Sequence, residues 1–162
     1  MKIYKYKTLL NDSGNPYLTK GNEYKIDGRK TFNSPDVVTE FIYNGIELHK
    51  YAEEYLWILC LDSKNHLVGC FEISHGTVNS SHCSPREIFQ KALMIGAVSI
   101  IMCHNHPSGD ATPSEADIVT TKSVKDAGDV VGVKLFDHII VSRNGYSSLK
   151  EMGGCNVLES NS

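Results

Sequence analysis

Short apolar runs alternate with amphipathic segments along most of the chain. Residues 55–61 and 97–103 are almost continuously apolar and rich in large side chains, which indicates buried strands. Weaker strand patterns follow at residues 66–73 and 131–141, and a short one ends the series at residues 146–149. The polar segments between the runs are long enough for helices. The pattern therefore predicts an α/β fold, with a mixed central β-sheet flanked by helices.

Three segments carry helix-start signals followed by apolar positions at a period near 3.6. A serine precedes each start, and a proline occupies the first helical position of the first two. Ser84 and Glu87 also have the spacing of a capping box. We expect Gly128 to stop the third helix. The predicted helices are residues 35–46, 85–95 and 115–126.

The two ends of the chain differ from its middle. Residues 2–7 alternate lysine with aromatic or aliphatic side chains, which suits an edge strand, and a turn-rich stretch follows at residues 11–16. The tail is polar. We therefore divide the chain into an N-terminal extension of strand and turn packed on the core (1–33), a core domain (34–152) and a loose tail (153–162).

Two histidines end the second apolar run. Side chains two positions apart in an extended segment point the same way, so His104 and His106 should face one point and Asn105 should face away. Ser114 opens the third helix, and residues three apart lie on one helix face, so Asp117 can return toward the histidines. Two nitrogens and one carboxylate, with a position left for water, are what a catalytic zinc site requires.

Each part of this motif has a simpler explanation. A His-x-His pair is common in proteins. Ser114 and Asp117 have the spacing of a capping box, and the prolines and glycine between are turn residues. The combination is much rarer than its parts, because capping does not explain two histidines just before the turn. The whole pattern favours a metal site of His104, His106 and Asp117.

The motif resembles a known signature. His104-x-His106-Pro107, six intervening residues and Ser114-x-x-Asp117 resemble the JAMM (MPN-plus) metalloprotease motif. The string HNHPSG, at residues 104–109, is more similar to the bacterial RadC family, whose members are traditionally called DNA repair proteins. The resemblance covers residues 34–149. Further matching segments are residues 54–62, Gly76 with Thr77, residues 85–87, Asp117 with Thr121, and residues 137–140.

The resemblance implies a JAMM/MPN-like fold, with cytidine-deaminase-like layering, and one Zn²⁺ per chain. It also selects Glu54, rather than its neighbour Glu53, as the general base, because Glu54 lies eight residues before Asp62 as in the family. Zinc lowers the pKa of bound water to about 7, and a carboxylate nearby can then accept the proton. Ser114 would stabilise the oxyanion of a tetrahedral intermediate.

Two classes of function follow. The first is a zinc-dependent JAMM-type hydrolase of a peptide or protein substrate. It would cleave an amide bond, either an isopeptide bond or a bond at a peptide end, and loops such as residues 74–84 would set its specificity. The second is a RadC-type accessory protein of DNA metabolism with a structural or vestigial metal. A zinc deaminase is set aside, because its H-x-E and P-C-x-x-C pattern is absent from the sequence.

The charge of the chain bears on a role in DNA metabolism. The net charge is −3, so the chain has no general attraction for nucleic acid, although its first thirty residues are locally basic. The chain resembles a short form of the RadC family, without the helical DNA-binding-type module that precedes the domain in longer members. We therefore expect DNA binding to be weak or indirect. No apolar run approaches the length of a membrane span or forms a signal peptide, which predicts a cytoplasmic protein with no membrane partner.

The remaining candidate residues have ordinary interpretations. The five cysteines (60, 70, 83, 103 and 155) form no C-x-x-C motif and are expected to be reduced. Cys103 should point away from His104 and so is not expected to bind zinc. Asp137 and His138 either support the metal ligands or form a buried hydrogen-bonded pair. The other histidines (49, 66, 75 and 82) lack ligand spacing.

Overall fold

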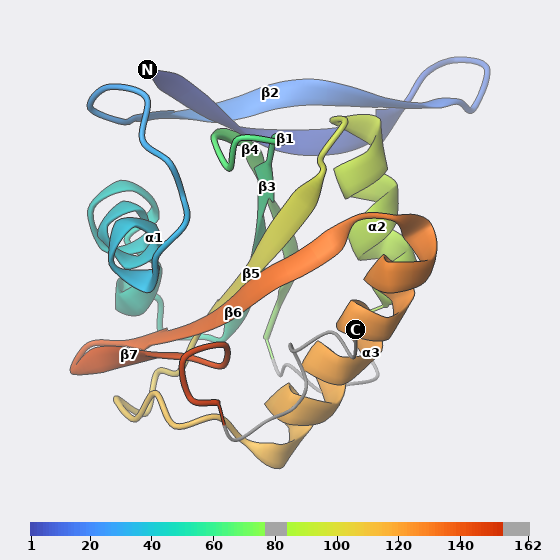
Figure 1. Cartoon of the computed structure of the whole chain (residues 1–162). Coiled ribbons are helices and arrows are strands. Elements are labelled where there is room, and N and C mark those ends of the chain that lie inside the picture. Colours follow the sequence, from blue (N-terminus) through green and yellow to red (C-terminus); the bar gives the residue numbers. More distant parts are fainter. Residues whose placement is uncertain (77–83, 154–162) are drawn as a thin grey trace.

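One seven-stranded sheet organises the part of the chain that the structure describes, residues 1–76 and 84–153 of a computed structural model. Its strand order is β2-β1-β4-β3-β5-β6-β7 (Figure 1). The strands are β1 (Lys2–Leu10), β2 (Pro16–Lys25), β3 (Tyr55–Leu61), β4 (Leu67–His75), β5 (Ser99–Asn105), β6 (Lys134–Ser142) and β7 (Gly145–Ser148). The helices are α1 (Pro35–Phe41), α2 (Pro85–Met94) and α3 (Glu115–Val131). A π-helical segment, Ile42–Ile46, continues α1, and a 3₁₀ turn follows at Leu48–Lys50.

The sheet is mixed. β3 is antiparallel to both of its neighbours, β4 and β5, whereas β5 is parallel to β6. Parallel neighbours need a crossover connection, and α3 supplies it. The carboxyl end of β5, the start of α3 and the start of β3 consequently meet at one end of the sheet. That meeting point is where the sequence places its candidate metal ligands.

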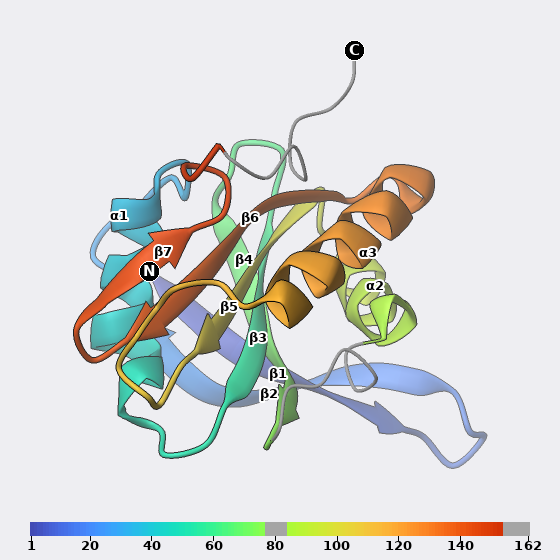
Figure 2. The same ribbon diagram turned by 90° about the horizontal axis from the view of Figure 1, so that it is seen from below.

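Helices cover the sheet on both faces. Figure 2 shows α1 on one side and α2 with α3 on the other. Side chains of β5 alternate between two cores: Ile101 and Cys103 pack on the α1 side, whereas Ile100 and Met102 pack against α2 and α3. Continuing this alternation places His104 on the α2/α3 side and Asn105 on the α1 side.

The predicted fold class is confirmed, and the strand predicted at residues 55–61 has the bounds of β3. The prediction that residues 2–7 form an edge strand is wrong, because β1 lies between β2 and β4. Residues 16–25 form a hairpin with β1 and occupy the edge instead. The N-terminal extension thus adds two strands to the same sheet.

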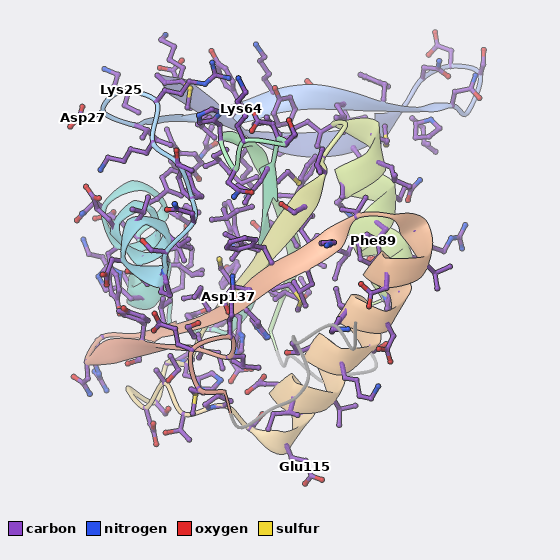
Figure 3. All side chains as sticks on the ribbon, viewed as in Figure 1. Lys25, Asp27, Lys64, Phe89, Glu115 and Asp137 are labelled. Carbon is purple, nitrogen blue, oxygen red and sulfur yellow. The ribbon has the colours of Figure 1, made fainter. Side chains whose placement is uncertain are left out.

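The prediction that Gly128 ends the third helix is also wrong, because α3 continues to Val131. Gly128 is needed for close packing: a Cβ there would lie 2.5 Å from the carbonyl oxygen of Val133 and 3.0 Å from Phe89, which Figure 3 labels on α2. Gly132 ends the helix, with the positive φ of 80° that glycine adopts readily.

The predicted capping box at the start of α2 does not form. Ser84 is the N-cap residue and Pro85 follows it, but the Ser84 side chain makes no capping hydrogen bond. Proline at the first helical position fixes the backbone without that bond. The helix start is therefore confirmed, and the capping mechanism is corrected.

Cys60, Cys70 and Cys103 are free and buried, as predicted. Burial raises the pKa of all three thiols, that of Cys70 to about 12, so they are unreactive core residues. Cys83, Cys155, His82 and Thr77 lie outside the described residues. None of the described helices is long and apolar enough to cross a membrane.

Candidate metal centre

The structure brings His104, His106 and Asp117 together at the end of β5. The Nε2 atoms of the two histidines are 2.8 Å apart. His104 Nε2 lies 3.2 Å from Asp117 Oδ1, and His106 Nε2 lies 3.4 Å from Asp117 Oδ2. These are the groups predicted from the spacing of the motif, and their donor atoms all lie within 4.8 Å of one another.

These distances fit a small tetrahedral metal ion. Bonds of the usual zinc length to nitrogen and oxygen place neighbouring ligand atoms about 3.3 Å apart in a tetrahedron. The three observed separations lie on either side of that value. The His104 side chain is 1% exposed and that of His106 is 14% exposed, so the cluster is closed on one side and open on the other. The group could hold a metal with one position free.

The backbone fixes the proton on His106. Its Nδ1 lies 2.8 Å from the carbonyl oxygen of Asp110, which can only accept a hydrogen bond. His106 therefore carries a proton on Nδ1, and its Nε2 faces His104 and Asp117. Two nitrogens and a carboxylate that converge in this way require a cation between them, either a metal or a proton.

Asp117 is ionised in this environment. Burial acts to raise its pKa, but hydrogen bonds from His104, His106 and Ser114 outweigh burial and hold the pKa well below the usual range. The same contact acts on His106, whose pKa is raised chiefly by its hydrogen bond to Asp117, against the lowering effect of burial. The charge of Glu54 contributes to the same rise.

The capping interpretation of Ser114 and Asp117 is confirmed, and it does not exclude a second role for Asp117. The Ser114 hydroxyl and its backbone N–H each donate a 2.7 Å hydrogen bond to Asp117 Oδ2, and the Asp117 N–H donates to Ser114 Oγ at 3.2 Å. The cap fixes the Asp117 side chain in the orientation that points it at the histidines. The cap thus holds the carboxylate of Asp117 where it could bind a metal together with the two histidines.

Glu54 lies directly before β3, where β3 pairs with β5. Leu56 is opposite His104 in that pairing, which brings the start of β3 to the candidate metal ligands. Glu54 is partly buried, whereas Glu53 is exposed. The charge of Glu54 contributes to the raised pKa of His106, so the Glu54 carboxylate is within electrostatic range of the candidate ligands. Its proposed role as base remains a prediction.

Asn105 has a role that the sequence did not reveal. Its side chain is buried on the α1 face. The Asn105 Oδ1 accepts a 2.7 Å hydrogen bond from the Tyr55 N–H, and its Nδ2 donates to the carbonyl of Glu53 at 2.9 Å and to that of Tyr51 at 3.2 Å. The residue between the two histidines therefore holds the segment that carries Glu54. A polar residue at an inward position of a strand was the only signal in the sequence.

The structure separates the roles of Asp137 and His138. Alternation along β6 places the two side chains on opposite faces, and the His138 backbone N–H donates a 2.7 Å hydrogen bond to Asp137 Oδ1. Asp137, on β6 in Figure 3, accepts hydrogen bonds from the Ser148 hydroxyl and the Lys150 N–H, and burial raises its pKa. His138 lies against His104, and its complete burial lowers its pKa. Among the described contacts, the side chain of His138 reaches a candidate metal ligand, His104, and that of Asp137 does not.

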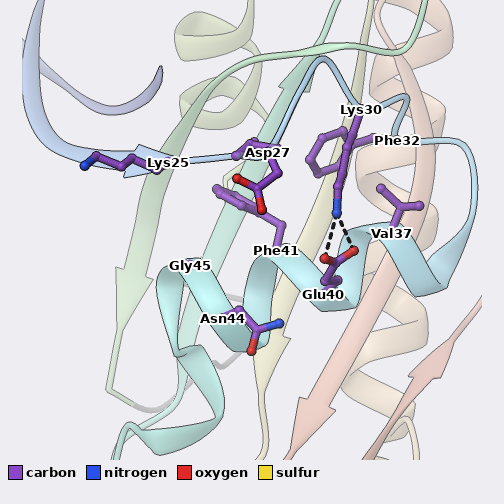
Figure 4. A pocket seen from close by; sticks show the side chains of 10 residues that line it. Lys25, Asp27, Lys30, Phe32, Val37, Glu40, Phe41, Asn44 and Gly45 are labelled. Carbon is purple, nitrogen blue, oxygen red and sulfur yellow. Dashed lines mark hydrogen bonds and ion pairs between the residues drawn. The ribbon is translucent and has the colours of Figure 1, made fainter. Parts of the chain in front are cut away.

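Two cavities in the described part of the chain differ in their relation to the cluster. One of about 330 Å³ is lined by Gly109 to Thr112, in the loop between β5 and α3, and by the β6–β7 turn, where Asn144 donates to the Gly109 carbonyl at 3.0 Å. Another of about 230 Å³ lies between α1 and residues 25–32 (Figure 4). There Lys30 is paired with both oxygens of Glu40, at 2.6 and 2.7 Å. The first cavity is connected to the candidate site through Asp110, whose carbonyl contacts His106.

Known proteins are similar to most of this chain. The family model described as "RadC-like JAB domain" matches residues 32–154. A UPF0758 protein of Clostridium novyi is 45% identical over 105 residues, which are 65% of this chain and 46% of that relative. One from Clostridium botulinum strain Okra is 44% identical over 133 residues, 82% of this chain and 55% of the relative. One from Desulfitobacterium hafniense is 40% identical over 125 residues, which are 77% of this chain and 54% of the relative. The chain thus spans about half the length of the curated relatives it matches.

Proposed function

Because the chain belongs to the family of RadC-like JAB domains, we propose that it is a zinc-dependent hydrolase of the JAMM type. Its substrate would be an amide or isopeptide bond in a peptide or protein. The proposal rests on one observation: His104, His106 and Asp117 converge with tetrahedral spacing on a point that is open on the side of His106. A structural zinc site would be closed by four protein ligands and would need no carboxylate such as Glu54 beside it.

Each residue has a defined part in this chemistry. A zinc ion held by the three ligands would supply Lewis-acid activation of water. Glu54 would accept the proton of the attacking water and pass it to the leaving amine. The Ser114 hydroxyl would turn from Asp117 toward the developing oxyanion. Asp117 Oδ2 would then keep its hydrogen bond from the Ser114 N–H, so the ligand stays oriented while the hydroxyl moves.

Peptide profiling tests the proposal without knowledge of the natural substrate. The zinc-loaded protein is incubated with a mixed library of peptides and lysine-linked isopeptides, and new amine ends are identified by mass spectrometry. We expect cleavage that a chelator abolishes and added zinc restores. An absence of zinc-dependent cleavage across both linkage types, in protein shown to contain zinc, would contradict the proposal and favour the accessory role in DNA metabolism.

A further inference from the structure

A chain of buried contacts connects the metal-facing ring of His104 to the backbone of α3. His104 Nδ1 lies 2.8 Å from His138 Nε2, and His138 Nδ1 lies 2.6 Å from Thr121 Oγ1. The Thr121 hydroxyl donates a 2.6 Å hydrogen bond to the backbone carbonyl of Asp117. His104, His138 and Thr121 are each at most 1% exposed. Because the Asp117 side chain also contacts His104, these four residues form a closed ring.

The backbone carbonyl of Asp117 sets the direction of the other hydrogen bonds in the ring. The Asp117 carbonyl has no proton, so the Thr121 hydroxyl must use its single proton there. The Thr121 oxygen can then only accept, and the proton between it and His138 belongs to His138 Nδ1.

The direction at His104 follows in turn. Within the described chain, the nitrogens of His138 hydrogen-bond to His104 and Thr121 and to no carboxylate. A fully enclosed imidazole without such a partner is neutral, because charging it there has a large desolvation cost. His138 Nε2 is consequently an acceptor, and His104 Nδ1 must donate to it. In its neutral form His104 then carries its single proton on Nδ1, which leaves Nε2 able to bind a metal.

We propose that Thr121 and His138 are positioning residues that hold His104 in the tautomer whose Nε2 can bind a metal. This inference rests on the proposed zinc site and extends it to two residues that do not touch the ion. Asp117 acts twice: its carboxylate is a ligand, and its carbonyl starts the ring that prepares another ligand. Partners of ligating histidines commonly fix the tautomer in this way, and their loss typically weakens metal binding roughly 10- to 100-fold.

Three matched variants separate positioning from simple packing. Thr121→Val keeps the shape of the side chain but removes the acceptor for His138. Thr121→Ser keeps the hydroxyl and should rescue the effect. Thr120→Val removes a buried hydroxyl from the next position of α3 that takes no part in the ring.

Zinc affinity is measured by competition with a chromophoric chelator, on variants that remain folded by circular dichroism. We expect Thr121→Val to bind zinc roughly 10- to 100-fold more weakly than the natural chain, and both other variants to stay within a few-fold of it. Equal affinities for Thr121→Val and Thr120→Val would overturn the proposal, since a packing role alone would lower stability and leave affinity unchanged.

Nitrogen-15 NMR of labelled histidines reads the tautomers directly and needs no activity. In the natural chain, with and without zinc, we expect His138 to carry its proton on Nδ1, and in the zinc-loaded protein we expect the same of His104. A His138 protonated at Nε2 would refute the ring as described. A zinc-loaded protein with these tautomers but no hydrolysis would refute the proposed function and leave this inference standing.

Discussion

The side-chain oxygen of Asn105 accepts a 2.7 Å hydrogen bond from the backbone N–H of Tyr55. Asn105 stands between the two histidines in the sequence, and Tyr55 directly follows Glu54. The bond therefore ties β5, which carries the candidate metal ligands, to the segment that carries the candidate base. It crosses from β5 to β3 on the face opposite the metal cluster, so it can set the distance between base and metal without occupying the site.

Asn105→Ala should separate metal binding from catalysis. The substitution removes three hydrogen bonds that hold residues 51–55, and a displacement of a catalytic group by about 1 Å can reduce the rate roughly 100-fold. We expect near-normal zinc content and a loss of turnover of that order, measured on the substrate found by profiling. Unsatisfied buried groups should also lower the free energy of unfolding by about 1–3 kcal/mol.

Asn105→Asp serves as the graded control, because a carboxylate can accept from Tyr55 but cannot donate to the carbonyls of Glu53 and Tyr51. Its turnover should fall between those of the natural chain and Asn105→Ala. Loss of zinc in step with loss of activity would show instead that Asn105 supports the metal strand itself.

The metal content of the purified protein provides the second test. We expect about one zinc per chain by elemental analysis, since the ligands are already assembled. His104→Ala and Asp117→Ala should each lose the metal, because two remaining protein ligands are too few for a stable zinc site. His66→Ala removes a histidine that pairs with Asp62 in the β3–β4 turn and should keep full zinc. Retention of zinc by both ligand variants would disprove the ligand set.

The zinc-free protein should show an unusual dependence of stability on pH. The pKa of His106 is raised above its ordinary value of 6.5 by Asp117, so folding favours its protonated form. The contribution of protonated His106 to the free energy of unfolding is complete below pH 6.5 and is lost as the pH rises through the raised pKa. His138, whose pKa is lowered by burial, is neutral in the folded protein, and its unfolded form is largely neutral well above pH 6.5, so it contributes little to the slope there.

Urea denaturation of zinc-free protein at a series of pH values above neutrality measures this effect. We expect the free energy of unfolding to decrease with pH in that window, and saturating zinc to abolish the decrease, because zinc replaces the proton between the ligands. His106→Asn should remove the slope, whereas His66→Ala should preserve it. A slope of the opposite sign would mean that His106 is neutral in the folded protein.

Local patterns were sufficient to predict the elements that bear the site. The apolar run at residues 55–61 predicted β3 because a strand buried on both faces reads as continuous hydrophobicity. The two-residue spacing of the histidines and the three-residue spacing of Ser114 and Asp117 predicted which side chains converge, because both depend only on strand and helix geometry.

Relationships between distant segments could not be predicted in the same way. The contact of Asn105 with Tyr55 needs the pairing of β3 with β5, and the ring through Thr121 and His138 needs the packing of α3 on β6. The helix end was misplaced for a similar reason. Gly128 reads as a stop signal in the sequence, but it is required by the closeness of Val133 and Phe89, which only the folded chain reveals.

Binding to duplex DNA distinguishes the two functional classes. The net charge of −3 offers little neutralisation of phosphates, which supplies most non-specific affinity. We expect no more than weak binding of this chain to arbitrary duplex near physiological salt, measured by fluorescence anisotropy. Submicromolar binding under those conditions would contradict the expectation and raise the accessory role above the hydrolase.

The most direct test of the proposed mechanism compares two adjacent carboxylates. Glu54→Gln keeps the size and shape of the side chain but removes its ability to accept a proton from water at the metal. General base catalysis typically contributes about a hundred- to ten-thousandfold, so we expect turnover to fall by at least that order while fold and zinc content stay largely intact.

Glu53→Gln is the matched control, because Glu53 is exposed while Glu54 is partly buried and its charge reaches His106. The substitution makes the same chemical change one position away and should leave turnover near normal. The decisive measurement is the initial rate of both variants at equal zinc content. Equal rates, or a greater loss from Glu53→Gln, would mean that Glu54 is not the base. Such rates would also mean that the hydrogen bonds of Asn105 do not serve to position a catalytic Glu54.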